Sequence, residues 1–450
     1  MKNTQDFTEG KIFAPLIRFA LPVLAALFLQ TMYGAVDLLV VGKLASSADV
    51  SAVSTGSMIL QTMTLAVTSL AMGLTILIGR KIGEGKREET GKIIGAGIWL
   101  FALMAVVLSV IMIFGATPAA RLMHAPAEAF DKTVSYITIC SAGTVFIVAF
   151  NLVGSIFRGM GNSTLPLVTV AIACAVNILG DLLLVAVFHL GTAGVAIATV
   201  FAQAVSVAVS LVIIRRQKLP FAFSARDIRP RGEYIGQILS LGTPIALQDL
   251  LVNISFLAVN AIVNTIGLTA SAGVGVAEKL CGFIMLVPSS YMQSMSAFVA
   301  QNMGAGKPRR ARKALLCGIA SSLAVGVVMF YMNFFHGDRM SGLFAVDPDV
   351  IAASAEYLKA YALDCLLTSF LFCFVGYFNG TGNTVFVMIQ GIIGAVGVRL
   401  VLSFLISRVT SDLFYIGLAT PASSLVQILL CGGFFALCLR KEKRGPSAVS

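Results

Sequence analysis

Residues 165–187 read LPLVTVAIACAVNILGDLLLVAV, an apolar run long enough to cross a membrane as one helix. Within it, Asn177 and Asp181 are four residues apart, so a helix places them one above the other on the same face. A carboxylate in the middle of a membrane helix costs about 2.5–3.5 kcal/mol on insertion scales, and such a residue marks a functional site by default. We therefore interpret the pair as part of a polar site within the membrane. The alternative for Asp181 is a structural acid that hydrogen-bonds neighbouring helices.

The composition is that of a membrane protein. The 450 residues are 58% hydrophobic and 12% charged, with a mean hydropathy of +0.92, whereas a soluble domain has about 25% charged residues. One apolar run after another reaches the roughly 20 residues that span a bilayer. We predict an all-α integral membrane protein with twelve transmembrane helices. The expected spans are 15–42, 51–79, 93–115, 133–157, 166–188, 193–214, 234–265, 276–300, 312–334, 351–377, 386–407 and 413–438.

The distribution of basic residues predicts the orientation. Most of the 32 lysines and arginines lie near the two ends of the chain and in alternate loops. Loops rich in lysine and arginine stay in the cytoplasm, so both termini are expected there, in a multi-pass protein of the cell membrane. The same asymmetry accounts for the net charge of +11, and no nucleic-acid partner is needed to explain it.

Three motifs occur twice at a nearly constant spacing, which indicates an internal duplication. The repeated pairs are Leu21-Pro22 and Thr243-Pro244, 82–86 and 303–307, and 157–162 and 378–383, at offsets of 222, 221 and 221. We expect an N-lobe (1–214, the first six spans), a basic cytoplasmic linker (215–233) and a C-lobe (234–450, the last six spans). Because six spans are an even number, the repeats are expected to be parallel, with a central cavity between them.

The aligned repeats differ in charge. Asp37 and Asp181 of the first repeat correspond to Asn260 and Ser403 of the second. The second repeat has instead gained a positive charge, Arg399, at the position of the asparagine that precedes Asp181. An acidic site that attracts cations is therefore predicted in the first repeat only.

Further polar residues of the first repeat could complete this site. Thr199 could add a hydroxyl, while Gln30 and Asn151 could add amides. Sodium prefers oxygen ligands, as other hard cations do, whereas a proton needs only a desolvated carboxylate. The sequence leaves the choice between the two ions open. For Asn177, Asn151, Gln30 and Thr199, hydrogen bonding between helices is the alternative role.

The second repeat has polar residues of its own. Along the seventh span, four of them fall within about 60° of arc on a helix and should face a cavity or another helix. They are Asp249, Asn253, Asn260 and Asn264. Four charged residues in or near other spans either neutralise one another or contact a substrate. They are Glu278, Lys279, Asp364 and Arg399.

No enzymatic or nucleotide-binding motif is present. The loops at 83–86 and 304–307 have the form Gly-x-Gly-Lys, but they lack the longer phosphate-loop pattern that ends in Gly-Lys-Ser/Thr. We find no nucleophile paired with a base. We therefore predict a protein that is not an enzyme, does not use ATP and has no cofactor other than a coupling ion.

Taken together, these motifs resemble the multidrug and toxic compound extrusion (MATE) family over nearly the whole chain. The resemblance is carried by Gln30…Asp37 followed by Val41-Gly42-Lys43-Leu44, the paired Gly-x-Gly-Lys loops, Arg158-Gly159-Met160-Gly161-Asn162, and Asn177-x3-Asp181 with Thr199. It is closest to the prokaryotic branch with a cation site in the N-terminal lobe. The resemblance implies a proton or sodium site formed by Asp37, Asn177, Asp181 and Thr199, with Gln30 and Asn151 as polar neighbours. The sequence departs from the branch with acids in the seventh and tenth helices, because Asp364 is displaced by about one turn and Glu278 lies in the eighth helix.

The family resemblance implies export of small amphipathic, often cationic compounds by alternating access, driven by inward movement of protons or sodium. We expect a monomer that contacts only its substrates and membrane lipids. One alternative is a flippase for a lipid-linked saccharide, which would favour a strongly basic cavity. Another is a membrane receptor or channel without coupled transport.

Overall fold

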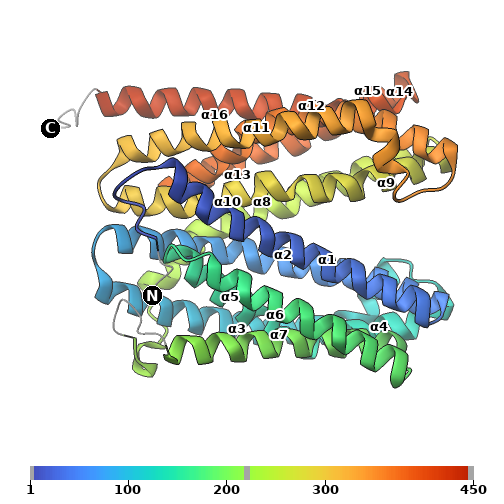
Figure 1. Cartoon of the computed structure of the whole chain (residues 1–450), viewed down its shortest axis with the longest axis horizontal. Coiled ribbons are helices and arrows are strands. Elements are labelled where there is room, and N and C mark those ends of the chain that lie inside the picture. The colour runs from blue at the N-terminus through green and yellow to red at the C-terminus, as the bar shows by residue number, and fades with distance from the viewer. Residues whose placement is uncertain (1–4, 217–222, 444–450) are drawn as a thin grey trace. The chain divides into compact units, whose positions relative to one another are not determined.

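The computed structural model describes residues 5–216 and 223–443, except for the side chains at 87, 225 and 443, and every regular element in these ranges is helical (Figure 1). Eleven helical segments are long and apolar enough to cross a membrane. A twelfth span is obtained if two shorter helices, bent by 53° where they meet, are counted as one. The predicted all-helical membrane fold is confirmed, and one of its twelve spans is broken.

The first six spans are formed by α1 to α7. Their bounds are α1 Phe13–Leu44, α2 Ser47–Gly83, α3 Arg87–Leu122, α4 Ala127–Ala142 with α5 Thr144–Gly159, α6 Thr164–Asp181 with the π-helical η1 Leu182–Val187, and α7 Gly191–Arg216. Several of these helices extend beyond the predicted apolar runs. In α2, for example, Ser46 and Asp49 form a reciprocal capping box before the first apolar residues.

The last six spans follow a short 3-10 turn, η2 (Ala225–Asp227). Their bounds are α8 Gly232–Asn264, α9 Leu268–Ile284 with α10 Leu286–Gly304, α11 Pro308–Ser341, α12 Pro348–Thr381, α13 Thr384–Ile392 with the π-helical η3 Ile393–Leu400 and α14 Val401–Val409, and α15 Leu413–Gly417 with α16 Ala419–Lys443. Part of the predicted linker, 217–222, lies outside the described residues.

The chain forms two compact units. The first comprises 1–246 together with 300–308, and the second comprises 247–299 together with 309–450. The lobe boundaries inferred from the sequence repeat, at 214 and 234, stay a prediction. The short segment 300–308 comes from the second half of the sequence but packs within the first unit.

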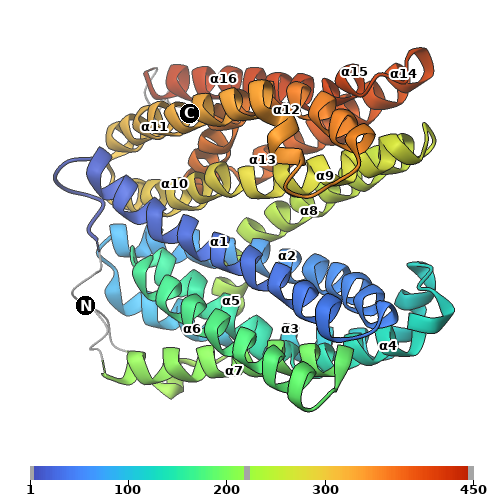
Figure 2. The same ribbon diagram turned by 45° about the vertical axis from the view of Figure 1, so that its right-hand side comes forward.

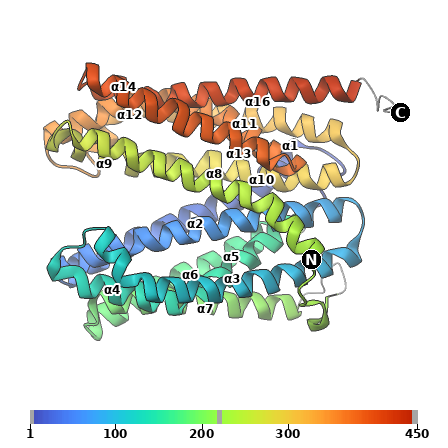
Figure 3. The same cartoon turned by 180° about the vertical axis from the view of Figure 1, so that it is seen from behind.

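In the first unit, α6 packs along α7 and against α1, while α2 packs against α4 and α5 (Figures 2 and 3). A core of large buried side chains, which includes Leu74, Phe101 and Phe157, joins α2, α3 and α5. The packing of α1 and α7 on α6 matters most for function, because it places polar residues from three distant parts of the sequence side by side.

In the second unit, α12 is the central helix. It packs against α9 and α16, and η3 packs against α16. Its core includes Tyr357, Leu358 and Tyr361 from α12, together with Val259 from α8. The helix that corresponds to α6 is interrupted here by η3. Both π-helical segments of the described chain therefore occur in matching spans, and such segments are frequent at functional sites.

Candidate functional site

Four polar residues of the first unit meet where α1, α6 and α7 pack together. Asp37 lies on α1, Asn177 and Asp181 lie one turn apart on α6, and Thr199 lies on α7. The side chains of Asp37, Asn177 and Asp181 are 6%, 1% and 0% exposed. The Asn177 amide nitrogen donates to the Thr199 hydroxyl at 3.4 Å. The structure thus brings together the four residues that the sequence assigned to one cation site.

Two carboxyl groups face each other in this cluster. The Asp37 carboxyl group contacts the side chains of Asp181, Asn177 and Thr199. One oxygen of Asp37, both oxygens of Asp181 and the amide oxygen of Asn177 are buried without a hydrogen-bond partner. Two carboxylates cannot hydrogen-bond each other unless a proton lies between them. Their charges repel in a poorly solvated site, which disfavours a state in which both are ionised and unaccompanied.

A positive charge is therefore needed at the Asp37–Asp181 pair, and the described residues supply none. Among the ion pairs of the described chain, none includes either aspartate. The open oxygens of Asp37, Asp181 and Asn177 fit a hard cation such as sodium. A single proton shared by the two carboxyl groups would satisfy the same charge requirement. The site is chemically suited to either exchangeable cation.

Asn151 and Gln30, the two polar neighbours expected from the sequence, differ from this cluster in their surroundings. The Asn151 amide nitrogen donates to the backbone oxygen of Ile147 at 2.8 Å, and its oxygen accepts from Thr68 at 2.9 Å. Asn151 thus joins α5 to α2, which corresponds to the structural alternative stated for it. Gln30 lies two turns before Asp37 on α1 and is half-buried.

Two residues next to the cluster escaped the sequence reasoning. Tyr33 on α1 hydrogen-bonds the side chain of Gln203 on α7, and the amide oxygen of Gln203 is buried without a partner. Tyr33 lies four residues before Asp37, and Gln203 lies four residues after Thr199. Both therefore lie on the helix faces that carry the candidate site. The four-residue spacing was the signal in the sequence that could have identified them.

The polar stripe of the seventh span contacts another helix along part of its length. The Asn260 amide nitrogen donates to the Glu278 carboxylate at 2.8 Å, and the Asn264 oxygen accepts from the Ser271 hydroxyl at 2.6 Å. Both bonds join α8 to α9. The other two members of the stripe, Asp249 and Asn253, are half-buried.

Arg399 is held by the helix that corresponds to α1. Its Nε donates to the Ser255 hydroxyl at 2.9 Å, and one terminal nitrogen donates to the backbone oxygen of Val252 at 3.1 Å. The guanidinium carbon lies 3.7 Å from the centre of the Phe256 ring. Arg399 is 5% exposed, so this charge is fixed inside the second unit.

The other charged residues of the second unit make no direct ion pair with Arg399 in the described chain. Asp364 is buried, Glu278 is half-buried and Lys279 is exposed. Glu278 is bonded to Asn260 instead. Any mutual neutralisation of these groups therefore acts over a longer distance than a contact ion pair.

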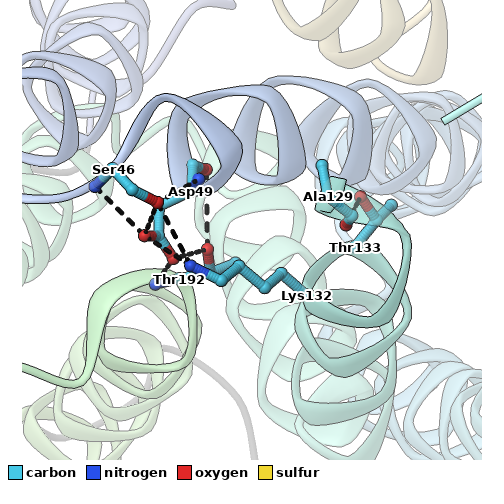
Figure 4. A network of polar contacts seen from close by, with 6 residues as sticks. All are labelled: Ser46, Asp49, Ala129, Lys132, Thr133 and Thr192. Atoms are coloured by element: carbon cyan, nitrogen blue, oxygen red, sulfur yellow. Dashed lines mark hydrogen bonds and ion pairs between the residues drawn. The ribbon is translucent and has the colours of Figure 1, made fainter. Parts of the chain in front are cut away.

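Asp49 is a third buried carboxylate of the first unit and allows a direct comparison (Figure 4). Asp49, near the start of α2, accepts from the Lys132 ammonium at 2.7 Å, from the Thr192 hydroxyl at 2.7 Å and from the Ser46 backbone nitrogen at 3.1 Å. It joins α2 to α4 and α7. The sequence analysis did not single it out, although the spacing of Ser46 and Asp49 is that of a capping box. The Asp49 carboxylate thus has an ion-pair partner and hydrogen-bond donors, whereas Asp37 and Asp181 have buried oxygens without a partner.

A duplicated helical membrane protein with a buried, uncompensated acidic site belongs to the class of polytopic transporters. The family model described as MatE matches residues 22–183 and again residues 244–405. The two matches begin 222 residues apart, at the offset of the repeated motifs. The chain belongs to the MatE family, which is a family of membrane transporters.

Curated relatives match nearly the full length. The probable multidrug resistance protein YoeA of Bacillus subtilis is 24% identical over 448 residues, which cover 98% of this chain and 97% of the relative. The multidrug export protein MepA of Staphylococcus aureus is 24% identical over 411 residues, which cover 87% of this chain and 88% of the relative.

Solved structures share the fold at lower identity. A MOP superfamily transporter from Pyrococcus furiosus has a TM-score of 0.91 and 18% identity, covering 97% of this chain and 98% of the other. A multidrug resistance MATE family transporter solved in an outward-facing conformation gives the same TM-score and identity, with 97% of both chains covered. These likenesses show that the whole chain has the MATE fold.

Proposed function

We propose that this protein is a secondary active multidrug exporter of the cell membrane. It moves small amphipathic, mainly cationic compounds outward in exchange for protons or sodium, by alternating access, with both of its termini in the cytoplasm. The family membership supports transport, and the names of the relatives support drugs as the substrate class. The residues of the first unit support the coupling to a cation.

The observation that carries the proposal is the buried Asp37–Asp181 pair, which has three open oxygen atoms, with a fourth on the neighbouring Asn177. A cation that enters from outside neutralises the pair and bonds oxygens on α1 and α6. Without the cation, the same oxygens lack partners and the two carboxylates repel each other. The packing of α1 on α6 therefore depends on occupancy. A drug that prefers one of the two arrangements is then coupled to the cation, because coupling between two sites is reciprocal.

The membrane potential limits the stoichiometry. Moving one positive drug outward against an inside-negative potential costs about 2.3 kcal/mol per 100 mV, and one cation moving inward returns the same amount. A one-for-one exchange of a monovalent drug therefore relies on the chemical gradient alone. Two carboxyl groups, Asp37 and Asp181, offer room for a second charge per cycle.

The flippase alternative is weakened by the surroundings of Arg399. A lipid-linked saccharide carries phosphate, and a site for it needs basic groups that are available to the ligand. Arg399 is instead bonded to Ser255 and Val252 and stacked on Phe256.

The test is uptake of a fluorescent cationic dye into proteoliposomes under an imposed proton or sodium gradient. Asp37→Asn and Asp181→Asn remove one charge each while keeping size and hydrogen-bonding capacity. We expect each to lower gradient-driven transport by about tenfold or more, within the usual range of coupling between sites. The matched control is Glu356→Gln, which removes the carboxylate that pairs with Lys359 on the exposed side of α12. The control should transport like the wild type, and the gradient that drives uptake identifies the ion. Near-normal transport by both aspartate variants would overturn the proposal.

A further inference from the structure

The repeated Gly-x-Gly-Lys motifs mark a reciprocal contact between two helix ends. Gly83 near the end of α2 and Gly304 at the end of α10 occupy equivalent positions in the repeat. A Cβ atom on Gly83 would lie 2.0 Å from the backbone oxygen of Gln301, and one on Gly304 would lie 2.0 Å from that of Arg80. No side chain fits at such a distance, so both positions require glycine. All four residues belong to the first compact unit.

The segment 5–8, which we call the N-terminal strap, is bonded to both sides of this region. The Gln5 backbone nitrogen donates to the backbone oxygen of Gly161, in the loop that follows α5, at 3.1 Å. In the opposite direction, the Asn302 amide nitrogen donates to the backbone oxygen of Phe7 at 3.1 Å, and the Lys307 ammonium donates to that of Thr8 at 3.0 Å. The strap therefore joins a loop of the first repeat to the end of α10, which belongs to the second.

The strap is anchored on the first repeat by one aromatic side chain. Phe7 is 0% exposed and packs edge-on against Phe19 of α1, with ring centres 5.2 Å apart. Gly161 has a φ of +80°, and a Cβ on it would lie 2.6 Å from the Gln5 backbone oxygen. The glycine both permits the turn and leaves room for the strap. The strap therefore accounts for the second glycine of the Gly-x-Gly motif at 159–161, whereas a Cβ on Gly159 would lie 2.8 Å from the backbone oxygen of Thr75.

The same two regions are also joined by a hydrogen bond that does not involve the strap. The Gln301 amide nitrogen donates to the backbone oxygen of Gly159 at 3.0 Å, and Gln301 is buried. The strap is thus held on the first repeat by the packing of Phe7 and by the Gln5–Gly161 bond, and on the second repeat by two hydrogen bonds alone. Apolar burial is lost only when Phe7 leaves its site, whereas hydrogen bonds can be exchanged for bonds to water at little net cost.

We propose that the N-terminal strap is a latch on the cytoplasmic gate of the transporter. This inference rests on the alternating access of the proposed function. The loops at 83–86, 157–162 and 304–307 lie on the lysine- and arginine-rich side, which is cytoplasmic by the positive-inside rule. To open toward the cytoplasm, the segment 301–307 must separate from the loop 159–161. The bonds from Asn302 and Lys307 to the strap then break, while Phe7 keeps the strap seated beside Phe19.

The test follows how often this gate opens, using a thiol placed behind it. In a cysteine-free background, Ala300→Cys introduces the thiol at a position that is 0% exposed, among Met72, Ile76 and Ile245. Inside-out membrane vesicles are treated with a membrane-impermeant maleimide, without drug and without an ion gradient. The wild-type strap should give slow labelling. Phe7→Ala should speed it by about tenfold, because a strap that is no longer seated beside Phe19 cannot hold Asn302 and Lys307, and the closed state then loses both of their hydrogen bonds.

A second reporter and a milder variant keep the test decisive. Ala105→Cys places a thiol in the buried core around α3, and its labelling should not change. Lys307→Met removes one bond to the strap, leaves Phe7 in place and should speed labelling at position 300 by about two- to threefold. It also provides the readout if Phe7→Ala does not fold. Unchanged labelling at position 300 in both variants would overturn the latch, as would equal increases at positions 300 and 105. Because no substrate is present, this outcome is independent of whether the Asp37 and Asp181 variants lose coupling.

Discussion

The two halves of the chain use matching helices in opposite ways. In the first half, α1 and α6 bury Asp37 and Asp181 side by side, with open oxygen atoms and no basic partner in the described residues. In the second half, α8 and η3 bury Arg399, whose guanidinium is bonded to Ser255 and stacked on Phe256. The guanidinium of Arg399 is a permanent positive charge, so its site does not need a cation from solution. A pair of uncompensated carboxyl groups needs a cation that comes from solution. We therefore propose that one half carries the exchangeable charge and that the other carries a permanent one.

The largest effect is expected when the charge of the second half is transferred to the first. Asn177→Arg places a guanidinium at the position that Arg399 occupies in the repeat, next to Asp37 and Asp181. A permanent positive charge would replace the exchangeable one, so gradient-driven dye transport should fall by about a hundredfold, near the upper end of coupling between sites. Transport in proteoliposomes measures this, and size-exclusion chromatography confirms folding. A folded variant with normal gradient dependence would refute the division of roles.

Removing the positive charge of the second half should affect stability more than coupling. Arg399→Met removes two hydrogen bonds and the stacking on Phe256, which together contribute about 2–3 kcal/mol. Ser255 still donates to the backbone oxygen of Ala395 at 2.9 Å, so it is not left without a bond. Thermal unfolding in detergent should show a lower midpoint, while dye transport keeps its dependence on the gradient. Loss of that dependence in well-folded protein would show that the second half also takes part in coupling.

Two threonines separate the cation site from ordinary helix packing. Thr199 contacts the Asp37 carboxyl group and Asn177, whereas Thr68 donates to Asn151 at 2.9 Å. Thr199→Val should raise the cation concentration for half-maximal transport about fivefold, the equivalent of one hydrogen bond of about 1 kcal/mol. Thr68→Val should lower stability by a similar amount without changing that concentration. If both variants shift it equally, the site is not confined to α1, α6 and α7.

The smallest effect is expected at the satisfied carboxylate of the first unit. Lys132→Met removes the ammonium group from Asp49, which keeps its bonds to Ser46 and Thr192. Because Lys132 is 43% exposed, the loss of stability should be about 0.5–1 kcal/mol. Thermal unfolding measures this loss, and transport should be unchanged. Altered coupling would mean that Asp49, although fully bonded, also contributes to cation binding. Open oxygens would then not be what distinguishes Asp37 and Asp181.

The sequence could predict the spans and the acidic cluster because both depend on patterns along the chain. Apolar runs determine which segments cross the membrane, and the spacing of Asn177 and Asp181 places them on one helix face. The bend at Gly143, which divides the fourth span, had no such signal, because α4 and α5 are separated by one glycine within an apolar run. The π-helical segments η1 and η3 were equally invisible in the apolar pattern.

Contacts between side chains depend on how each helix is rotated about its axis, and a single sequence does not specify this. The pairing of Asn151 with Thr68 and that of Tyr33 with Gln203 therefore emerged only from the structure. The strap shows the same limit. The sequence indicates no contacts for residues 5–8, and the repeated glycine motifs had no assigned role until the close approach of Gly83 to Gln301 and of Gly304 to Arg80 was known.

We propose that Asp37 and Asp181 hold a cation whose binding opposes the binding of drug. The most direct test is equilibrium binding of a fluorescent cationic drug to purified protein, measured across proton and sodium concentrations. For the wild type, saturating amounts of the coupling cation should raise the dissociation constant of the drug by about tenfold, because linkage between two ligands is reciprocal. In the double variant Asp37→Asn/Asp181→Asn, the constant should not vary with either ion. If the double variant retains the wild-type dependence, Asp37 and Asp181 do not hold the coupling cation.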